Sequence, residues 1–267
     1  MTTIDELCAD LDAEHSALDS VVADLTNDEW LTRTPAAGWD VRDCISHLCY
    51  FDETATLAIT DPDAFEDHKS VLIAAMAADD EPDVAIGREL NPPDAILDRW
   101  RVARRGYLDA ARAAASGRSK PPRVPWYGPS MSLASFTTAR IMETWAHGQD
   151  VRDALGEAPE IGPRLRHVIH IGVGARAYSF AAHGMTDPGD PVAWTAEAPD
   201  GGVWTWGPTE SGVGNRITGS AVDLALVLTQ RRHPSRTGVV ATGPVAQQWL
   251  AIAQAFAGAP TVTSPDR

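Results

Sequence analysis

The chain has 267 residues, of which 44% are hydrophobic and 22% are charged. This composition is typical of a soluble globular protein, and the length predicts one or two domains. The 22 basic and 37 acidic residues give a net charge of −15. An acidic surface of this kind repels nucleic acid and anionic membranes, so we expect neither as a partner.

The start of the chain has no basic segment followed by an apolar one, and no apolar run is long enough to span a bilayer. We therefore expect a cytoplasmic protein. The three cysteines, Cys8, Cys44 and Cys49, are few and odd in number, which favours reduced thiols over a disulfide framework. We interpret Cys44 as a small buried hydrophobic side chain.

The first 157 residues predict a bundle of four long helices. Thr3 and Glu6 form a capping-box pattern, and Asp40 is placed to cap the second helix with Asp43 in its first turn. Gly156 is placed to end the last one. The predicted helices are Thr3–Thr26, Asp40–Thr60, a shorter one at Phe65–Ala78, Asn91–Ser116 and Ser132–Leu155. We interpret the acidic run at 79–83 as part of a loop that adds solubility.

After Gly156 the pattern changes to that of a small α+β domain, which we place at residues 158–260, with residues 261–267 as a tail. Two short runs separated by Pro-Asp-Gly-Gly predict a β-hairpin. The expected elements are a helix at Pro163–His183, strands at 191–198, 202–207 and 239–241, and helices at Ser220–Gln230 and Pro244–Phe256.

Glu143 and His147 form the most informative pair in the sequence. They lie four residues apart in a predicted helix, so both side chains project from nearly the same side. His47 lies in an earlier predicted helix, and antiparallel packing of the two helices brings all three together. Two histidines and one glutamate are a known ligand set for catalytic zinc, with one position left for water.

The sequence offers four weaker candidates besides this set. Asp43, four residues before His47, and Asp150, three residues after His147, are each placed to accept a hydrogen bond from a ligand imidazole. The alternatives are a helix cap for Asp43 and a solvated surface acid for Asp150. Two further candidates, Arg231 and Arg232, are placed to hold an anionic substrate or the carboxylate of a thiol, or to interact with the end of a helix dipole. We leave Cys44 outside the metal shell.

Two segments resemble the metal-binding domain of the mycothiol-dependent maleylpyruvate isomerase family, a branch of the DinB-like four-helix bundles. They are GWDVRDCISHL at residues 38–48 and ETWAHGQDVRDAL at 143–155. The likeness is strongest to an actinobacterial group of this family whose activity is not established. Residues 218–232 resemble, more loosely, the family's C-terminal α/β domain, which is similar to sterol-carrier folds. By this resemblance His47, Glu143 and His147 are the metal ligands.

The resemblance implies chemistry in which a low-molecular-weight thiol, mycothiol, adds to a cis double bond, permits rotation and leaves. We therefore predict a zinc-binding enzyme, an isomerase or thiol transferase, that acts on a small molecule. Two alternatives stay open. One is a metal-dependent hydrolase in which Asp43 or Asp150 serves as a base. The other is a non-enzymatic protein whose α/β domain binds a small ligand while the metal braces the bundle.

Overall fold

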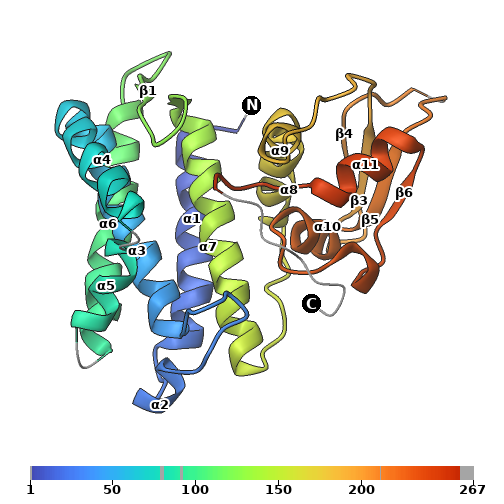
Figure 1. Ribbon diagram of the computed structural model, residues 1–267. Coiled ribbons are helices and arrows are strands. Elements are labelled where there is room, and N and C mark those ends of the chain that lie inside the picture. The colour runs from blue at the N-terminus through green and yellow to red at the C-terminus, as the bar shows by residue number, and fades with distance from the viewer. Residues whose placement is uncertain (1, 79–80, 91–92, 211, 259–267) are drawn as a thin grey trace. The chain divides into compact units, whose positions relative to one another are not determined.

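The computed structural model describes four stretches of the chain: residues 2–78, 81–90, 93–210 and 212–258. The chain forms two compact units, Met1–Pro159 and Glu160–Arg267 (Figure 1). The boundary predicted from the sequence lies after residue 157. The predicted tail, 261–267, lies outside the described residues.

Four long helices form the first unit, and the predicted fold class is confirmed. They are α1 (Ile4–Val22), α3 (Val41–Thr60), α6 (Asp94–Ala115) and α7 (Leu133–Leu155). α3 packs against α6 and α7, and α1 packs against the same two helices. Each long helix therefore has two long neighbours, as in a four-helix bundle. The predicted cap of α6, Asn91 with Pro92, lies outside the described residues.

The capping residues identified in the sequence lie at helix ends in the structure, as predicted. At the start of α1, the Thr3 hydroxyl accepts the backbone N–H of Glu6, whose carboxylate accepts the backbone N–H of Thr3. Asp40 and Asp43 form the same reciprocal pair at the start of α3. α7 is followed by Gly156, whose φ of 74° lies in the left-handed region that glycine adopts without a steric penalty.

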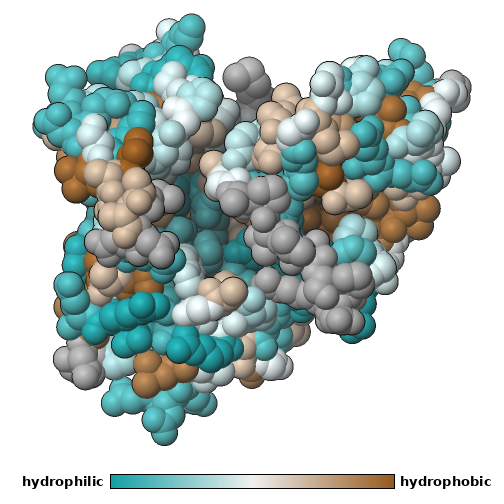
Figure 2. Space-filling model, viewed as in Figure 1, coloured by the Kyte–Doolittle hydropathy of each residue, from teal (hydrophilic) through white to brown (hydrophobic). Residues whose placement is uncertain are grey.

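Buried apolar side chains fill the bundle in two clusters. The first includes Leu11, Phe65, Tyr107 and Phe136, and the second includes Leu18, Ile45, Trp100 and Val151. Buried polar side chains lie between the clusters along the helices, as His15 does between Leu11 and Leu18 on α1. On the face of the molecule in Figure 2, hydrophilic residues predominate and hydrophobic ones form separate patches.

The connections of the first unit contain several short elements. α1 ends at Val22 and not at Thr26, and a further turn, α2 (Asn27–Trp30), follows it. α4 (Pro62–Ala77) corresponds to the predicted shorter helix. β1 (Arg123–Val124) pairs antiparallel with β2 (Met131–Ser132).

The prediction of an acidic loop after α4 is wrong from Pro82 onward, where α5 (Pro82–Glu89) forms. Pro82 occupies the first turn, where its missing N–H costs no hydrogen bond, and Asp83 stabilises the positive end of the helix dipole. α5 packs closely on α3. A Cβ at position 87 would lie only 2.9 Å from Ser46 Cβ, so the glycine there permits this close approach. The backbone N–H of Gly87 also donates to Ser46 Oγ.

The second unit combines a four-stranded sheet with helices, in the strand order β4-β3-β5-β6. β3 pairs antiparallel with β4 and parallel with β5, and β5 pairs antiparallel with β6. The strands are β3 (Ala193–Glu197), β4 (Val203–Trp206), β5 (Arg216–Ser220) and β6 (Val240–Thr242). The helices are α8 (Leu165–Gly174), α9 (Arg176–Ala182), α10 (Ala221–Leu228) and α11 (Pro244–Ile252), with a short 3-10 turn η1 at Pro234–Arg236.

The structure differs from the sequence predictions at three places in this unit. The helix predicted at Pro163–His183 is two helices, separated at Ala175. β5 was not predicted, and it is the strand that joins the β3–β4 hairpin to β6. The last helix ends at Ile252 and not at Phe256. No helix among the described residues is long and apolar enough to cross a membrane.

Candidate metal centre

Three side chains from two helices of the bundle converge. His47 extends from α3, and Glu143 and His147 extend from α7. One potential ligand atom of each lies within 4.8 Å of the other two. Glu143 Oε2 lies 3.5 Å from His147 Nε2 and 3.9 Å from His47 Nε2. Ligands 2.0–2.1 Å from a tetrahedral zinc ion are about 3.4 Å apart, so the separations suit a single ion after small side-chain adjustments.

Helix geometry explains this convergence. Glu143 and His147 are four residues apart on α7 and therefore share one face of that helix. That face packs against α3 at the level of His47. The imidazole centroids of His47 and His147 are 4.4 Å apart, and both Nε2 atoms face the Glu143 carboxylate.

Asp83, which the sequence interpretation had assigned to a solubilising acidic run, is the hydrogen-bond partner of His47. Its Oδ2 lies 2.7 Å from His47 Nδ1, and the two side chains are 14% and 16% exposed. Ser46, the residue before His47, donates through Oγ to the backbone carbonyl of Asp83. A carboxylate on Nδ1 favours the tautomer whose Nε2 lone pair faces the ligand cluster.

Asp43 has a different set of contacts from the one predicted for it. Its carboxylate accepts the backbone N–H of Asp40 and two hydrogen bonds from Arg88, each at 3.3 Å. These contacts agree with the alternative of a helix cap. The position beside His47 that the sequence suggested for Asp43 is taken by Asp83.

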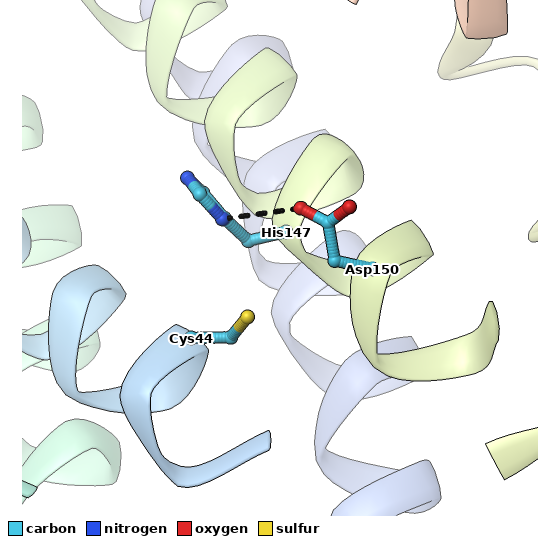
Figure 3. A group of neighbouring side chains, drawn as sticks. All are labelled: Cys44, His147 and Asp150. Atoms are coloured by element: carbon cyan, nitrogen blue, oxygen red, sulfur yellow. Dashed lines mark ion pairs between the residues drawn. The ribbon is translucent and has the colours of Figure 1, made fainter. Parts of the chain in front are cut away.

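Asp150 lies beside His147 and not in solvent. Its Oδ2 is 3.6 Å from His147 Nδ1, and its side chain is 1% exposed (Figure 3). This distance is an ion-pair distance and exceeds that of a hydrogen bond. Figure 3 also shows Cys44, from α3, pointing toward the same side of the imidazole. Cys44, His147 and Asp150 form a second group whose potential ligand atoms lie within 4.8 Å of one another.

The electrostatics of the cluster favour a charged carboxylate among basic groups. Burial acts to raise the pKa of Glu143, but His147 and His47 outweigh burial and hold this pKa well below its ordinary value. Burial acts to lower the pKa of His47, and hydrogen bonds with Asp83 and Glu143 reverse this, so the pKa is raised. Burial likewise acts to raise the pKa of Asp83, yet the bond to His47 leaves it lowered.

Aromatic rings hold the two imidazoles in place. The Trp39 ring stacks on that of His147, with centroids 5.5 Å apart and planes inclined by 19°, and lies 5.1 Å from the His47 ring. Phe51, one helical turn after His47, contacts it at 4.5 Å between centroids. Glu143 nevertheless remains 24% exposed. The cluster is therefore anchored on its apolar side and still accessible from solvent.

Arg231 and Arg232 lie in the second unit, just after α10. The guanidinium of Arg231 donates to the carbonyl of Thr229, and that of Arg232 donates to the carbonyl of Arg231. Their role toward a substrate stays a prediction. Trp194 of this unit is buried against Trp249, with ring centroids 4.8 Å apart.

The donor set fits a borderline divalent ion. Two imidazole nitrogens and one carboxylate oxygen are ligands that zinc accepts, and three protein ligands leave a position for an exchangeable group. The orientation of His47 by a carboxylate on Nδ1, that of Asp83, is a common accompaniment of metal ligation. Fold and site together define a helical-bundle protein with a candidate two-histidine, one-glutamate centre.

Comparisons with known proteins place the chain in a family. Residues 11–152 match the N-terminal domain of mycothiol maleylpyruvate isomerases. The chain belongs to this family, as its resemblance in sequence predicted. Two uncharacterized proteins of Mycobacterium tuberculosis, from strains CDC 1551 / Oshkosh and ATCC 25618 / H37Rv, are each 42% identical to it over 252 residues. Those alignments cover 94% of this chain and 95% of each relative.

Solved structures have the same fold. The crystal structure of the mycothiol-dependent maleylpyruvate isomerase and that of a histidine-to-alanine mutant of it each align with a TM-score of 0.59. The alignments cover 90% of this chain and 93% of the isomerase, at 14% sequence identity. At this identity the likeness describes the fold and not the substrate.

Proposed function

We propose that this protein is a thiol-dependent isomerase or thiol transferase whose centre holds one divalent ion, zinc, on His47, Glu143 and His147. The observation that carries the proposal is the convergence of two Nε2 atoms on one carboxylate oxygen, at 3.5 and 3.9 Å. Membership of the mycothiol maleylpyruvate isomerase family supports a thiol, mycothiol, as the co-substrate.

Different residues of the chain would bind the ion, orient its ligands and shield the centre. His47, Glu143 and His147 would hold the ion, and Asp83 and Asp150 would orient the imidazoles. Bound zinc would supply a site that deprotonates a thiol at neutral pH and so makes it a usable nucleophile. The thiolate would add to a cis double bond of a small organic substrate, and its departure after rotation would leave the trans isomer. Trp39 and Phe51 would shield the apolar side of the centre from water.

Two features weigh against the rival functions. A hydrolase needs a base on the open side of the metal, whereas Asp83 and Asp150 lie on the Nδ1 sides of the histidines and Asp43 caps a helix. A purely structural zinc site is closed by four protein ligands, whereas this cluster offers three and leaves Glu143 24% exposed.

Cobalt substitution tests the proposal directly. The protein would be loaded with Co²⁺ and titrated with mycothiol, and with S-methyl mycothiol as the control that cannot form a thiolate. We expect a new near-ultraviolet sulfur-to-cobalt band with mycothiol alone. A Cys44→Ala variant should give the same band, since the sulfur then comes from the added thiol and not from the protein.

Turnover provides the second measurement. Maleylpyruvate, the substrate in the name of the structural relatives, is the first compound to assay for cis–trans isomerisation with and without mycothiol. A cobalt spectrum that mycothiol leaves unchanged would refute the thiol-dependent function. Hydrolytic turnover that needs the metal but no thiol would favour the hydrolase instead.

A further inference from the structure

A layer of buried polar side chains crosses the bundle between its two apolar clusters. Three long helices contribute to it, with His15 from α1, Asp52 from α3 and Arg140 from α7, and Trp100 of α6 borders it from the second apolar cluster against the His15 ring. All four are at most 3% exposed. The layer contains an ion pair in which Arg140 Nη2 and Nε donate to Asp52 Oδ1 at 2.9 and 3.1 Å.

Stability alone does not account for this pair. Taking two charges out of water costs about as much as their attraction returns, so an apolar pair of similar size is often equally stable. The polar atoms around the pair are also poorly matched. Asp52 Oδ2 and both ring nitrogens of His15 have no hydrogen-bond partner among the described residues, although Oδ2 and Nε2 are only 3.7 Å apart. A buried pair of this kind is better suited to specifying one arrangement of helices than to increasing the free energy of unfolding.

The pair joins the two helices that carry the candidate metal ligands. Asp52 follows His47 by five residues on α3, which corresponds to about 7.5 Å along the helix. Arg140 precedes Glu143 by three residues on α7, or about 4.5 Å. Because higher numbers on α3 meet lower numbers on α7, the two helices run in opposite directions. The ion pair and the ligand cluster are thus successive contacts along one helix–helix interface.

We propose that Asp52 and Arg140 are positioning residues of the metal centre, which set the axial register of α3 against α7. This inference rests on the metal centre proposed above. A slip of one residue moves a helix by about 1.5 Å. A functional constellation tolerates only about 0.5 Å, so the register decides whether the α3 ligand, His47, can share an ion with the α7 ligands.

Another ion pair on α3 provides a matched control. Glu53, the residue after Asp52, accepts two hydrogen bonds from Arg99 at 2.8 and 2.9 Å. This pair joins α3 to α6, which carries none of the three ligands, and its side chains are 37% and 43% exposed. Loss of the Glu53 pair therefore disturbs α3 without releasing its register against α7.

The experiment compares zinc affinity, measured by competition with a chromophoric chelator, and the visible spectrum of the cobalt-loaded protein. The variants are Asp52→Asn, the double variant Asp52→Asn/Arg140→Gln, and the control Glu53→Gln/Arg99→Gln. The double variant removes both buried charges and keeps similar shapes, so it should fold even where the single variant does not. Thermal melts establish the temperature at which each protein is folded.

We expect the Asp52 variants, while folded, to bind zinc about 10- to 100-fold more weakly and to give an altered cobalt spectrum. The control should match the wild type in both. A purely structural role would lower the melting temperature and leave affinity and spectrum unchanged, and this result would overturn the positioning role alone. A wild-type chain that takes up no zinc would overturn the metal centre, and the positioning role with it.

Discussion

Replacing Asp83 should weaken metal binding while the bundle stays folded. Asp83 Oδ2 lies 2.7 Å from His47 Nδ1, and both side chains are shielded from solvent. A hydrogen bond to a charged group contributes about 1.5–3 kcal/mol and one between neutral groups about 0.5–1.5 kcal/mol. Asp83→Asn keeps the shape but loses the charge, so we expect the free energy of zinc binding to become less favourable by about 1 kcal/mol, which is about fivefold in zinc affinity.

Asp83→Ala removes the hydrogen bond altogether and should lower zinc affinity by about 10- to 100-fold. The assay is a competitive titration of zinc against a chromophoric chelator at pH 7.5, where carboxylates are ionised. The control is Asp43→Asn, which removes a capping and Arg88-paired carboxylate on the same helix as His47. It should lower stability by about 1 kcal/mol and leave zinc affinity unchanged.

Two results would contradict a role of Asp83 in orienting His47. Equal zinc affinity in the wild type and Asp83→Ala would mean that the contact with His47 does not orient a ligand. A loss in Asp43→Asn as large as that in Asp83→Ala would mean that any perturbation near the start of α3 suffices, and that the 2.7 Å contact has no special role.

Four further outcomes follow from the same geometry. His47→Ala, Glu143→Ala and His147→Ala should each remove most of the bound metal, and elemental analysis that finds full occupancy in all three would exclude the centre. Because protons compete with metal for imidazole and the pKa of His47 is raised, affinity should begin to fall above the ordinary histidine value of about 6.5 as the pH drops; occupancy unchanged down to about pH 4 would contradict histidine ligation. Chelation should lower the melting temperature but preserve the helical circular dichroism signal, since the bundle has an apolar core of its own; a chain that unfolds on chelation would make the metal structural. Gly87→Ala places a Cβ 2.9 Å from Ser46 Cβ, so α5 must shift and zinc affinity should fall with it; wild-type affinity would show that the position of α5 is immaterial.

Much of the fold could be predicted from local signals. The capping boxes at Thr3 and Asp40 and the glycine at 156 mark helix ends through interactions within a few residues, so one stretch of sequence suffices to find them. The β3–β4 hairpin has the same local character. β5 was missed because it pairs in parallel with β3, a distant partner, and its five residues carry no turn signal of their own.

The candidate ligands were likewise accessible to sequence. Glu143 and His147 share a face because the helix repeats every 3.6 residues, and this holds whatever the helix packs against. His47 was selected by its helical context and by resemblance to the family. Its meeting with the other two depends on the packing of α3 against α7.

Only the tertiary structure decided which carboxylates lie beside the Nδ1 atoms of the two histidines. By sequence distance Asp43 was the natural partner of His47, yet its position in the first turn of α3 directs it to the helix end and to Arg88. Asp83, thirty-six residues away, reaches His47 because Gly87 allows α5 to pack closely on α3. Contacts within a helix follow from its repeat, whereas contacts between helices depend on close packing that no single segment encodes.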